Sequence, residues 1–341
     1  MLNTIYRLVK PRKFEIEFED IDLNGDVVIV RPAYLSICNA DQRYYQGKRD
    51  PKVLEKKLPM ALIHEAIGEI VYDSKDEFKA GEWVVMIPNT PYEEDSVIAE
   101  NYLRSSKFRA SGFDGFMQDN VAMRRDRLVR LPEQIDRRVA AFIEIISVSY
   151  HTVKRFMNIS HARKEAIAIW GDGNLGYIVS LILRYHLPDA QIFILGVDDD
   201  KLSAFTFADK TYHVNNIPED FTFDHAFECV GGMGCEMADN QIIDYIKPEG
   251  TIALMGVSEN KVPINTRMVL EKGLRMFGSS RSGRADFIET VKFLSENEKA
   301  VNLFTNLINE VVDVNNVDDM IYAFESDIKK SGGKTIMRWN I

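Results

Sequence analysis

Cysteine is scarce in this sequence, and long apolar runs are missing from it. The only cysteines are Cys38, Cys229 and Cys235, and three thiols cannot form the disulfide framework of a secreted scaffold. No apolar run approaches the length of a membrane span, and the first ten residues are too polar for a secretory signal. We therefore expect a cytoplasmic protein whose thiols stay reduced.

The sequence also lacks an excess of positive charge. It carries 42 basic residues against 52 acidic ones, a formal net charge of −10. This balance argues against nucleic acid or an anionic membrane surface as the main partner. The hydrophobic content of 45% is that of an ordinary globular protein, and 341 residues are enough for two domains.

In the first part of the chain, short β-like runs alternate with turns that Gly or Pro often marks. The predicted strands are Lys13–Phe18, Asp26–Pro32, Ala66–Tyr72, Glu82–Pro88 and Asn120–Met123. Apolar residues at three- and four-residue spacing then predict a helix over Arg137–Phe156. Residues 1–150 are therefore expected to form a mostly β domain.

From Glu165 onward, predicted strands alternate with helical segments, which is typical of a parallel sheet with right-handed crossovers. The strands are Ala166–Trp170, Gln191–Leu195, Thr222–Glu228 and Gly250–Met255, and a helix is expected over Leu175–Tyr185. We assign this α/β domain to residues 151–283.

The last segment, from about residue 284 to 341, is predicted to complete the first domain. It is expected to hold helices at Ala285–Glu296 and Val317–Ser326 and an edge strand at Thr335–Trp339.

A glycine-rich turn lies between the first predicted strand of the α/β domain and its helix. Gly171, Gly173 and Gly176 satisfy the pattern G-x-G-x-x-G, and Asn174 and Leu175 open the helix. Free amides at such a helix start can face a pyrophosphate. We predict that these five residues bind a dinucleotide; a βα turn that binds no nucleotide is the alternative.

The end of the second strand bears on the choice of cofactor. An acidic residue about 20 positions past the glycines would bind the ribose 2′-hydroxyl of NAD, and that position falls at Gly196. Glycine leaves space for the 2′-phosphate of NADP, and Lys201 is near enough in sequence to neutralise it. Against this, Asp198 follows closely and begins a run of three aspartates. The pattern favours NADP and leaves NAD open.

Four residues have the character of a catalytic zinc site: Cys38, His64, Glu65 and Glu144. A thiolate, an imidazole and carboxylates suit zinc, and a site with room for water or substrate acts as a Lewis acid. Glu144 lies among apolar neighbours, where an unpaired carboxylate would be costly. With the glycine turn, this set indicates a metal-assisted hydride transfer with a nicotinamide cofactor.

The spacing of these residues resembles that of the zinc-dependent medium-chain dehydrogenases, the superfamily of alcohol and sorbitol dehydrogenases. The similar motifs are Cys38-x-x-Asp41, His64-Glu-x-x-Gly-Glu69 and Glu144-x-x-Ser-Val148. The resemblance implies a Rossmann-type dinucleotide domain and a GroES-like catalytic domain. It also implies that Cys38, His64 and Glu144 bind zinc, that Glu65 is a fourth ligand or an exchangeable neighbour, and that Asp41 orients His64.

Two departures from the superfamily pattern are visible. The stretch from residue 89 to 111 has no cysteine, so the four-cysteine structural zinc of many members is not expected here. Ala40 stands where the family's proton relay normally begins with Ser or Thr. We expect one zinc per chain and leave the proton route open.

Within the superfamily, the chain resembles the ribulose-5-phosphate reductases. The similar segments include Tyr34–Tyr45, Leu58–Glu65 and Ile169–Tyr177. The resemblance implies reduction of D-ribulose 5-phosphate to D-ribitol 5-phosphate with NADPH, for teichoic-acid or capsule polymers. It further implies a homodimer and, as a partner, the cytidylyltransferase that consumes the product.

Basic residues provide a candidate site for the substrate phosphate. Arg43, Lys48 and Arg49 follow the zinc cysteine, and Arg281 is a further candidate for this phosphate or for the cofactor. A solvated surface loop is the alternative interpretation of the cluster. A different activity, NAD-linked oxidation of an unphosphorylated polyol, also stays open, as does a nucleotide-binding protein without turnover.

Overall fold

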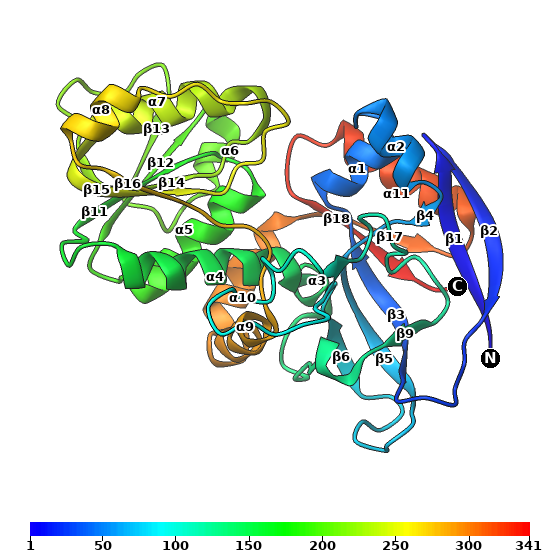
Figure 1. The fold of residues 1–341 in the computed structure, drawn as a ribbon. Coiled ribbons are helices and arrows are strands. Elements are labelled where there is room, and N and C mark those ends of the chain that lie inside the picture. The colour runs from blue at the N-terminus through cyan, green and yellow to red at the C-terminus, as the bar shows by residue number, and fades with distance from the viewer. The chain divides into compact units, whose positions relative to one another are not determined.

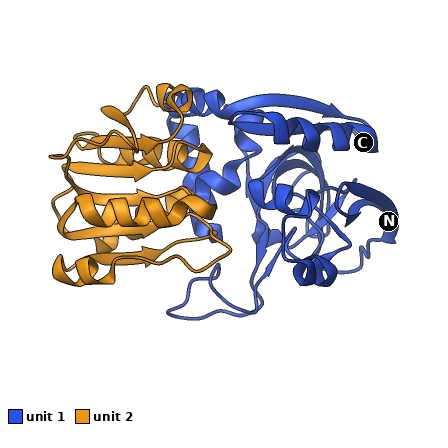
Figure 2. Cartoon of the chain, turned by 90° about the horizontal axis from the view of Figure 1, so that it is seen from above, with its two compact units in different colours: residues 1–147, 282–341 blue, residues 148–281 orange.

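The computed structural model describes residues 1–341, and the chain divides into two compact units (Figure 2). The first unit comprises Met1–Ser147 and Ser282–Ile341, and the second comprises Val148–Arg281. Two separate stretches of the chain therefore build the first unit.

The first unit contains three sheets. The largest has the strand order β10-β6-β5-β3-β18-β17, with β9 paired to β3; the second has the order β2-β1-β4, and the third pairs β7 with β8. Their bounds are β1 (Leu2–Lys10), β2 (Lys13–Asp20), β3 (Val28–Ser36), β4 (Met60–Ala61), β5 (Glu65–Asp73), β6 (Trp83–Met86), β7 (Asn89–Thr90), β8 (Lys107–Phe108), β9 (Val121–Met123), β10 (Leu128–Arg130), β17 (Ile308–Val314) and β18 (Lys334–Trp339).

The prediction that the C-terminal strand lies at a sheet edge is wrong. Strand β18 lies between β3 and β17: Ile336 pairs with Ser36 on one side and with Val311 on the other. Its residues are buried except for Arg338, as an internal strand covered on both faces requires. The edge is formed by β17, which the sequence pattern did not reveal.

Helices of the first unit are α1 (Asn39–Tyr45), α2 (Pro51–Lys57), α3 (Arg137–Ala140), α9 (Arg284–Glu296), α10 (Glu298–Phe304) and α11 (Val317–Lys329), and α4 (Ile143–Ile159) crosses the boundary between the units. The helix predicted over 137–156 is thus divided into α3 and α4. None of the helices is both long and apolar enough for a membrane span.

Helix α11 fixes the position of α1. The ring of Phe324 stacks on that of Tyr45 with the centroids 4.6 Å apart. Gln42 Nε2 donates to the Phe324 carbonyl oxygen at 2.9 Å and to Asp327 Oδ2 at 2.8 Å. Because Cys38 caps the N-terminus of α1, these contacts also hold the cysteine in place.

The second unit is a six-stranded parallel sheet with the order β13-β12-β11-β14-β15-β16. Its elements are β11 (Ala166–Trp170), α5 (Asn174–His186), β12 (Gln191–Gly196), α6 (Asp199–Ser203), β13 (Lys210–His213), β14 (Phe223–Glu228), α7 (Cys235–Tyr245), β15 (Ile246–Leu254), α8 (Thr266–Glu271) and β16 (Arg275–Gly278). Helices α7 and α8 cover one face, and α5 covers the other (Figure 1). The predicted α/β fold class, a doubly wound sheet beside a mostly β domain, is confirmed.

Candidate metal centre and cofactor site

Three of the four predicted metal ligands come together in the first unit. Cys38 is the N-cap of α1, His64 directly precedes β5, and Glu65 is the first residue of that strand. The thiol, one imidazole nitrogen and one carboxylate oxygen lie within 4.8 Å of one another. His64 and Glu65 are buried, whereas Cys38 is partly exposed. These atoms could share a single cation.

Asp41 connects the segments that carry these residues. Its Oδ2 accepts a hydrogen bond from the Cys38 backbone at 3.2 Å, and its Oδ1 accepts one from the Ile63 backbone at 3.0 Å. Oδ1 also lies 3.5 Å from His64 Nδ1, so Nε2 is the ring nitrogen left for a cation. Burial lowers the pKa of His64, but the charges of Asp41 and Cys38 outweigh burial and hold that pKa well above its ordinary value. The site therefore attracts positive charge.

Lys334, which sequence reasoning missed, pairs with Glu65. Lys334 Nζ donates to Glu65 Oε1 at 3.0 Å and lies 2.7 Å from Oε2, and both side chains are almost fully buried. Each carboxylate oxygen has two lone pairs, so Glu65 can pair with Lys334 and still offer a lone pair to a metal. The one signal in the sequence is a lysine at the start of a strand that is mostly buried.

Glu144 lies in the first turn of α4, buried, but outside the group of ligand atoms within 4.8 Å. Burial raises the pKa of Glu144 to about 7; the charges of Glu65 and Asp41 add to the rise, while His64 and Lys334 oppose it. A bound cation would stabilise the ionised form of Glu144, which burial and the neighbouring carboxylates disfavour.

Zinc fits the donors that converge here. They are a thiol, an imidazole, a buried carboxylate that is also paired with Lys334, and a second buried carboxyl group nearby. This mixture of one sulfur, one nitrogen and oxygens is typical of catalytic zinc sites and unlike the oxygen-only sites of magnesium or calcium.

The glycine turn of the second unit has the geometry of a nucleotide site. Helix α5 begins at Asn174 and continues through Leu175, and Gly173 is its N-cap. A Cβ on Gly176 would lie 1.9 Å from the Gly171 carbonyl oxygen, whereas a Cβ on Gly173 would meet no atom within 4 Å. Gly176 thus permits the close packing of helix and strand, and Gly173 leaves open space that a pyrophosphate could use.

Asp172 occupies the place beside Gly196, and sequence reasoning missed its role. Asp172 Oδ2 accepts hydrogen bonds from the backbones of Val197 at 2.7 Å and Asp198 at 2.9 Å. A Cβ on Gly196 would lie 2.6 Å from the Asp172 side chain. A larger residue at position 196 would therefore collide with Asp172, which explains the glycine independently of the predicted space for a phosphate.

The predicted phosphate partner Lys201 has a carboxylate nearby. Asp198 caps α6 by accepting a hydrogen bond from the Lys201 backbone at 3.1 Å, and its Oδ2 lies 3.6 Å from Lys201 Nζ. Hydrogen bonding to that backbone lowers the pKa of Asp198. Lys201 therefore approaches a 2′-phosphate only with an aspartate beside it.

The predicted phosphate-binding residues divide between the units. Arg43, Lys48 and Arg49 belong to the first unit, Lys48 being exposed, whereas Arg281 belongs to the second. Burial and the nearby charge of Arg49 lower the pKa of Arg43. Two guanidinium groups held so close together favour an anion in their neighbourhood.

A third cation joins this cluster. The Arg49 guanidinium lies 4.9 Å from the centre of the Tyr44 ring, and Lys57 Nζ lies 5.8 Å from it. Lys57 Nζ also donates to Ser111 Oγ at 3.0 Å. The buried Tyr44 ring thus gathers cations from α2 and from the loop after α1.

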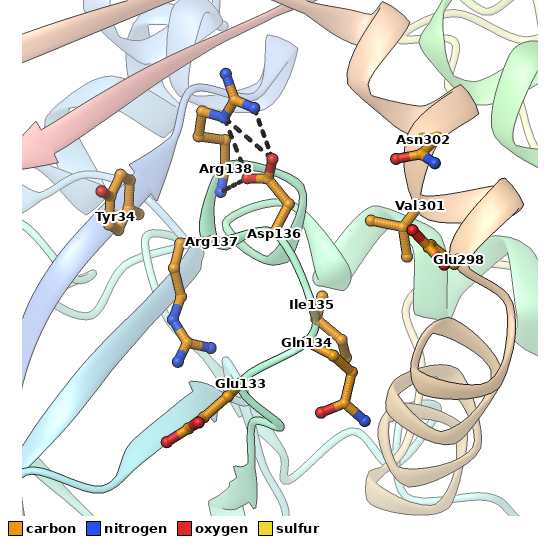
Figure 3. A pocket seen from close by; sticks show the side chains of 10 residues that line it. All are labelled: Tyr34, Glu133, Gln134, Ile135, Asp136, Arg137, Arg138, Glu298, Val301 and Asn302. Carbon is orange, nitrogen blue, oxygen red and sulfur yellow. Dashed lines mark hydrogen bonds and ion pairs between the residues drawn. The ribbon is translucent and has the colours of Figure 1, made fainter.

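A separate pocket of about 440 Å³ lies in the first unit (Figure 3). It is lined by Tyr34, Glu133, Gln134, Ile135, Asp136, Arg137, Arg138, Glu298, Val301 and Asn302. Arg138 is paired with Asp136, which lies two positions earlier in the chain. None of the predicted site residues lines this pocket.

The fold and the thiol–imidazole–carboxylate group define a zinc-type alcohol dehydrogenase, and the comparisons with known proteins agree. The chain belongs to this family: the Alcohol dehydrogenase GroES-like domain matches residues 24–133, and the Zinc-binding dehydrogenase domain matches residues 195–296. It is 52% identical to ribulose-5-phosphate reductase 1 of Staphylococcus aureus, with 99% of each chain covered. It is 51% identical to ribulose-5-phosphate reductase of Bacillus spizizenii over the whole of both chains.

Solved structures match over the full length as well. S. aureus TarJ in complex with NADPH has a TM-score of 0.90 at 47% identity, with both chains fully covered. L-Idonate 5-dehydrogenase from Escherichia coli has a TM-score of 0.87 at 20% identity, with 99% of each chain covered. The second match concerns the fold alone.

Proposed function

We propose that this protein is a zinc-dependent oxidoreductase that reduces D-ribulose 5-phosphate to D-ribitol 5-phosphate with NADPH. The observation that carries the chemistry is the group of Cys38, His64 and Glu65, whose ligand atoms lie within 4.8 Å of one another. The full-length identity of 51–52% to ribulose-5-phosphate reductases supports the substrate. The product would supply teichoic-acid or capsule polymers.

Cys38, His64, Glu65 and Glu144 are the proposed zinc ligands, and Asp41 orients the imidazole through Nδ1. A bound zinc would supply Lewis-acid polarisation of the substrate carbonyl, and NADPH would supply the hydride. Lys334 balances the charge of Glu65. Residue 40 is alanine, so it has no hydroxyl group that could start a proton relay.

The glycine turn is the proposed cofactor site, with Gly171, Gly173, Asn174, Leu175 and Gly176 around the pyrophosphate. Gly196 and Lys201 are proposed for the 2′-phosphate of NADPH, and Arg281 stays a candidate in the same unit. The relative crystallised with NADPH supports this choice. The contact between Lys201 and Asp198 is the observation that keeps NAD as the alternative cofactor.

Arg43 and Arg49 are the proposed phosphate ligands, and Lys57 supports them across the Tyr44 ring. Lys48 is a more exposed member of the cluster. Replacing Arg49 by alanine removes a charge-assisted contact worth about 1.5–3 kcal/mol, which would raise KM for ribulose 5-phosphate about tenfold or more. The exposed Glu55 on α2 offers a control, Glu55→Ala, for which KM should stay within about twofold.

The decisive assay follows NADPH oxidation with ribulose 5-phosphate, before and after treatment with a chelator. We expect turnover that chelation abolishes and zinc restores. Sorbitol with NAD tests the alternative activity in the same experiment. Faster turnover of sorbitol with NAD, or full activity of a metal-free preparation, would contradict the proposal.

The parallel sheet of the second unit has a free edge at β16 (Arg275–Gly278). Strand β16 is an outer strand of the parallel sheet and pairs only with β15, so its free edge could join that of a second copy. We propose a homodimer through this edge, which light scattering on the eluting protein would test. The three free thiols support a cytoplasmic location, and the cytidylyltransferase stays a predicted partner.

A further inference from the structure

One buried carboxylate joins two loops of the second unit. Glu228 is the last residue of β14 and is 1% exposed. Its Oε1 accepts hydrogen bonds from the Val230 backbone at 2.7 Å and the Gly231 backbone at 3.1 Å. Its Oε2 accepts one from the Gly256 backbone at 2.9 Å. Thus a single side chain holds the loop after β14 and the loop after β15.

The backbone around Glu228 is built to admit this carboxylate. A Cβ on Gly256 would lie 2.4 Å from Oε1, so only glycine allows the approach. The Gly232 backbone donates to the Val257 carbonyl oxygen at 2.9 Å, which connects the same two loops a second time. Three N–H groups on one buried carboxylate make a strong, charge-assisted fixation.

These loops border the glycine turn. In the parallel sheet, Glu228 is in register with Trp170 of β11 and with Leu254 of β15, at the carboxyl ends of the strands. The Cys229 backbone donates to the Trp170 carbonyl oxygen at 2.7 Å, and a Cβ on Gly171 would touch Cys229. Dinucleotides bind at this edge, with the two mononucleotides over opposite halves of the sheet.

The position of β14 decides which half of the cofactor is involved. Strand β12 carries the ribose position for the adenosine half, and it pairs with β11 on the side away from β14. The loops after β14 and β15 therefore border the other half, which carries the nicotinamide.

We propose that Glu228 is a positioning residue for the nicotinamide half of the cofactor. It acts through the backbone of the two loops that it holds and does not touch the reacting atoms. The inference rests on the proposed function in one respect, namely that the cofactor is a nicotinamide dinucleotide.

The test compares two buried carboxylates of the same strand. Asp224 is at the opposite end of β14 and is also fully buried. Its Oδ2 accepts from the Glu165 and Ala166 backbones at 3.0 and 3.1 Å. Glu228→Gln and Asp224→Asn should therefore both lower the unfolding midpoint, but only Glu228→Gln should affect the cofactor.

Two probes separate positioning from general damage. NADPH covers both halves of the site, and adenosine 2′,5′-bisphosphate covers only the adenosine half. In Glu228→Gln we expect Kd for NADPH to rise about tenfold, which corresponds to about 1.4 kcal/mol, while Kd for the bisphosphate stays within twofold. In Asp224→Asn both constants should match those of the wild type. Equal NADPH affinity in Glu228→Gln and wild type, or an equal loss for both probes, would overturn the inference.

Hydrogen exchange on the wild type provides a second measurement that needs no variant. NADPH should slow exchange in peptides spanning residues 229–234 and 255–258, and the bisphosphate should not. Unchanged exchange with NADPH bound would refute the role of Glu228. A wild-type protein that binds no NADPH at all would instead overturn the proposed function, and the inference with it.

Discussion

The two glycines at the start of α5 should respond to alanine in opposite ways. At Gly176 the new Cβ would lie 1.9 Å from the Gly171 carbonyl oxygen and 3.0 Å from its carbon. Relieving this overlap requires the helix to move away from the turn by more than 1 Å, about the shortfall from van der Waals contact. Overpacking of this kind costs about 1–3 kcal/mol, and we expect the upper end because both atoms belong to the backbone.

At Gly173 the same methyl group meets no protein atom within 4 Å. The residue has φ −88° and ψ −175°, which alanine adopts without strain. Stability should therefore change by less than about 0.5 kcal/mol, as for surface positions. The methyl would instead occupy space needed for the approach of the pyrophosphate, so we expect NADPH affinity to fall at least about tenfold.

Urea unfolding followed by tryptophan fluorescence measures the first effect, because Trp170 is fully buried at the end of β11. Titration of NADPH fluorescence measures the second. Gly173→Ala should separate the two readouts, with normal stability and poor binding. Wild-type affinity in Gly173→Ala, or wild-type stability in Gly176→Ala, would refute the reasoning.

Two further substitutions test buried charges. Lys334→Met leaves the Glu65 carboxylate buried without its cation. The free energy of unfolding of the metal-free protein should therefore fall by about 3–5 kcal/mol, and added zinc should restore part of it. A urea midpoint equal to that of the wild type would contradict the pairing. Burial, with the charge of Glu228, raises the pKa of Asp239 to about 6. Because this folded-state pKa exceeds the unfolded one, the wild type loses stability as the pH rises through 6. Asp239→Asn should therefore raise Tm at pH 8 and leave it nearly unchanged at pH 4, and an equal shift at both would argue against a raised pKa.

Much of the fold could be predicted from patterns of neighbouring residues. The strand at Ala166–Trp170 has the predicted bounds. Its end could be predicted because the run of apolar residues stops at the glycine-rich turn that begins with Gly171. The donors at Cys38, His64 and Glu65 could be found because their types are rare together and their motifs resemble a family. In each case the signal lies within a few neighbouring residues.

Contacts between distant residues could not be found in this way. Lys334 is 269 positions from Glu65, and nothing local shows that a lysine at a strand start will neutralise a carboxylate in another strand. The internal position of β18 could not be predicted for the same reason, because a short strand of mixed polar and apolar residues can lie at the edge or in the centre of a sheet until its neighbours are known. The role of Asp172 depends on two amides of a loop 25 and 26 residues away.

The insertion of β18 between β3 and β17 has a consequence for biosynthesis. The residues of the metal group are translated early, but the strand that completes their sheet begins at Lys334, which is translated 269 positions after Glu65. Trp339 also donates to the Gln118 carbonyl oxygen at 3.0 Å, bridging 221 positions. During synthesis, the second unit can fold before the first, because all its strands precede β17. The large sheet of the first unit lacks β17 and β18 until these strands have been synthesised. The buried carboxylate of Glu65 therefore gains its cationic partner only after β18 has been synthesised.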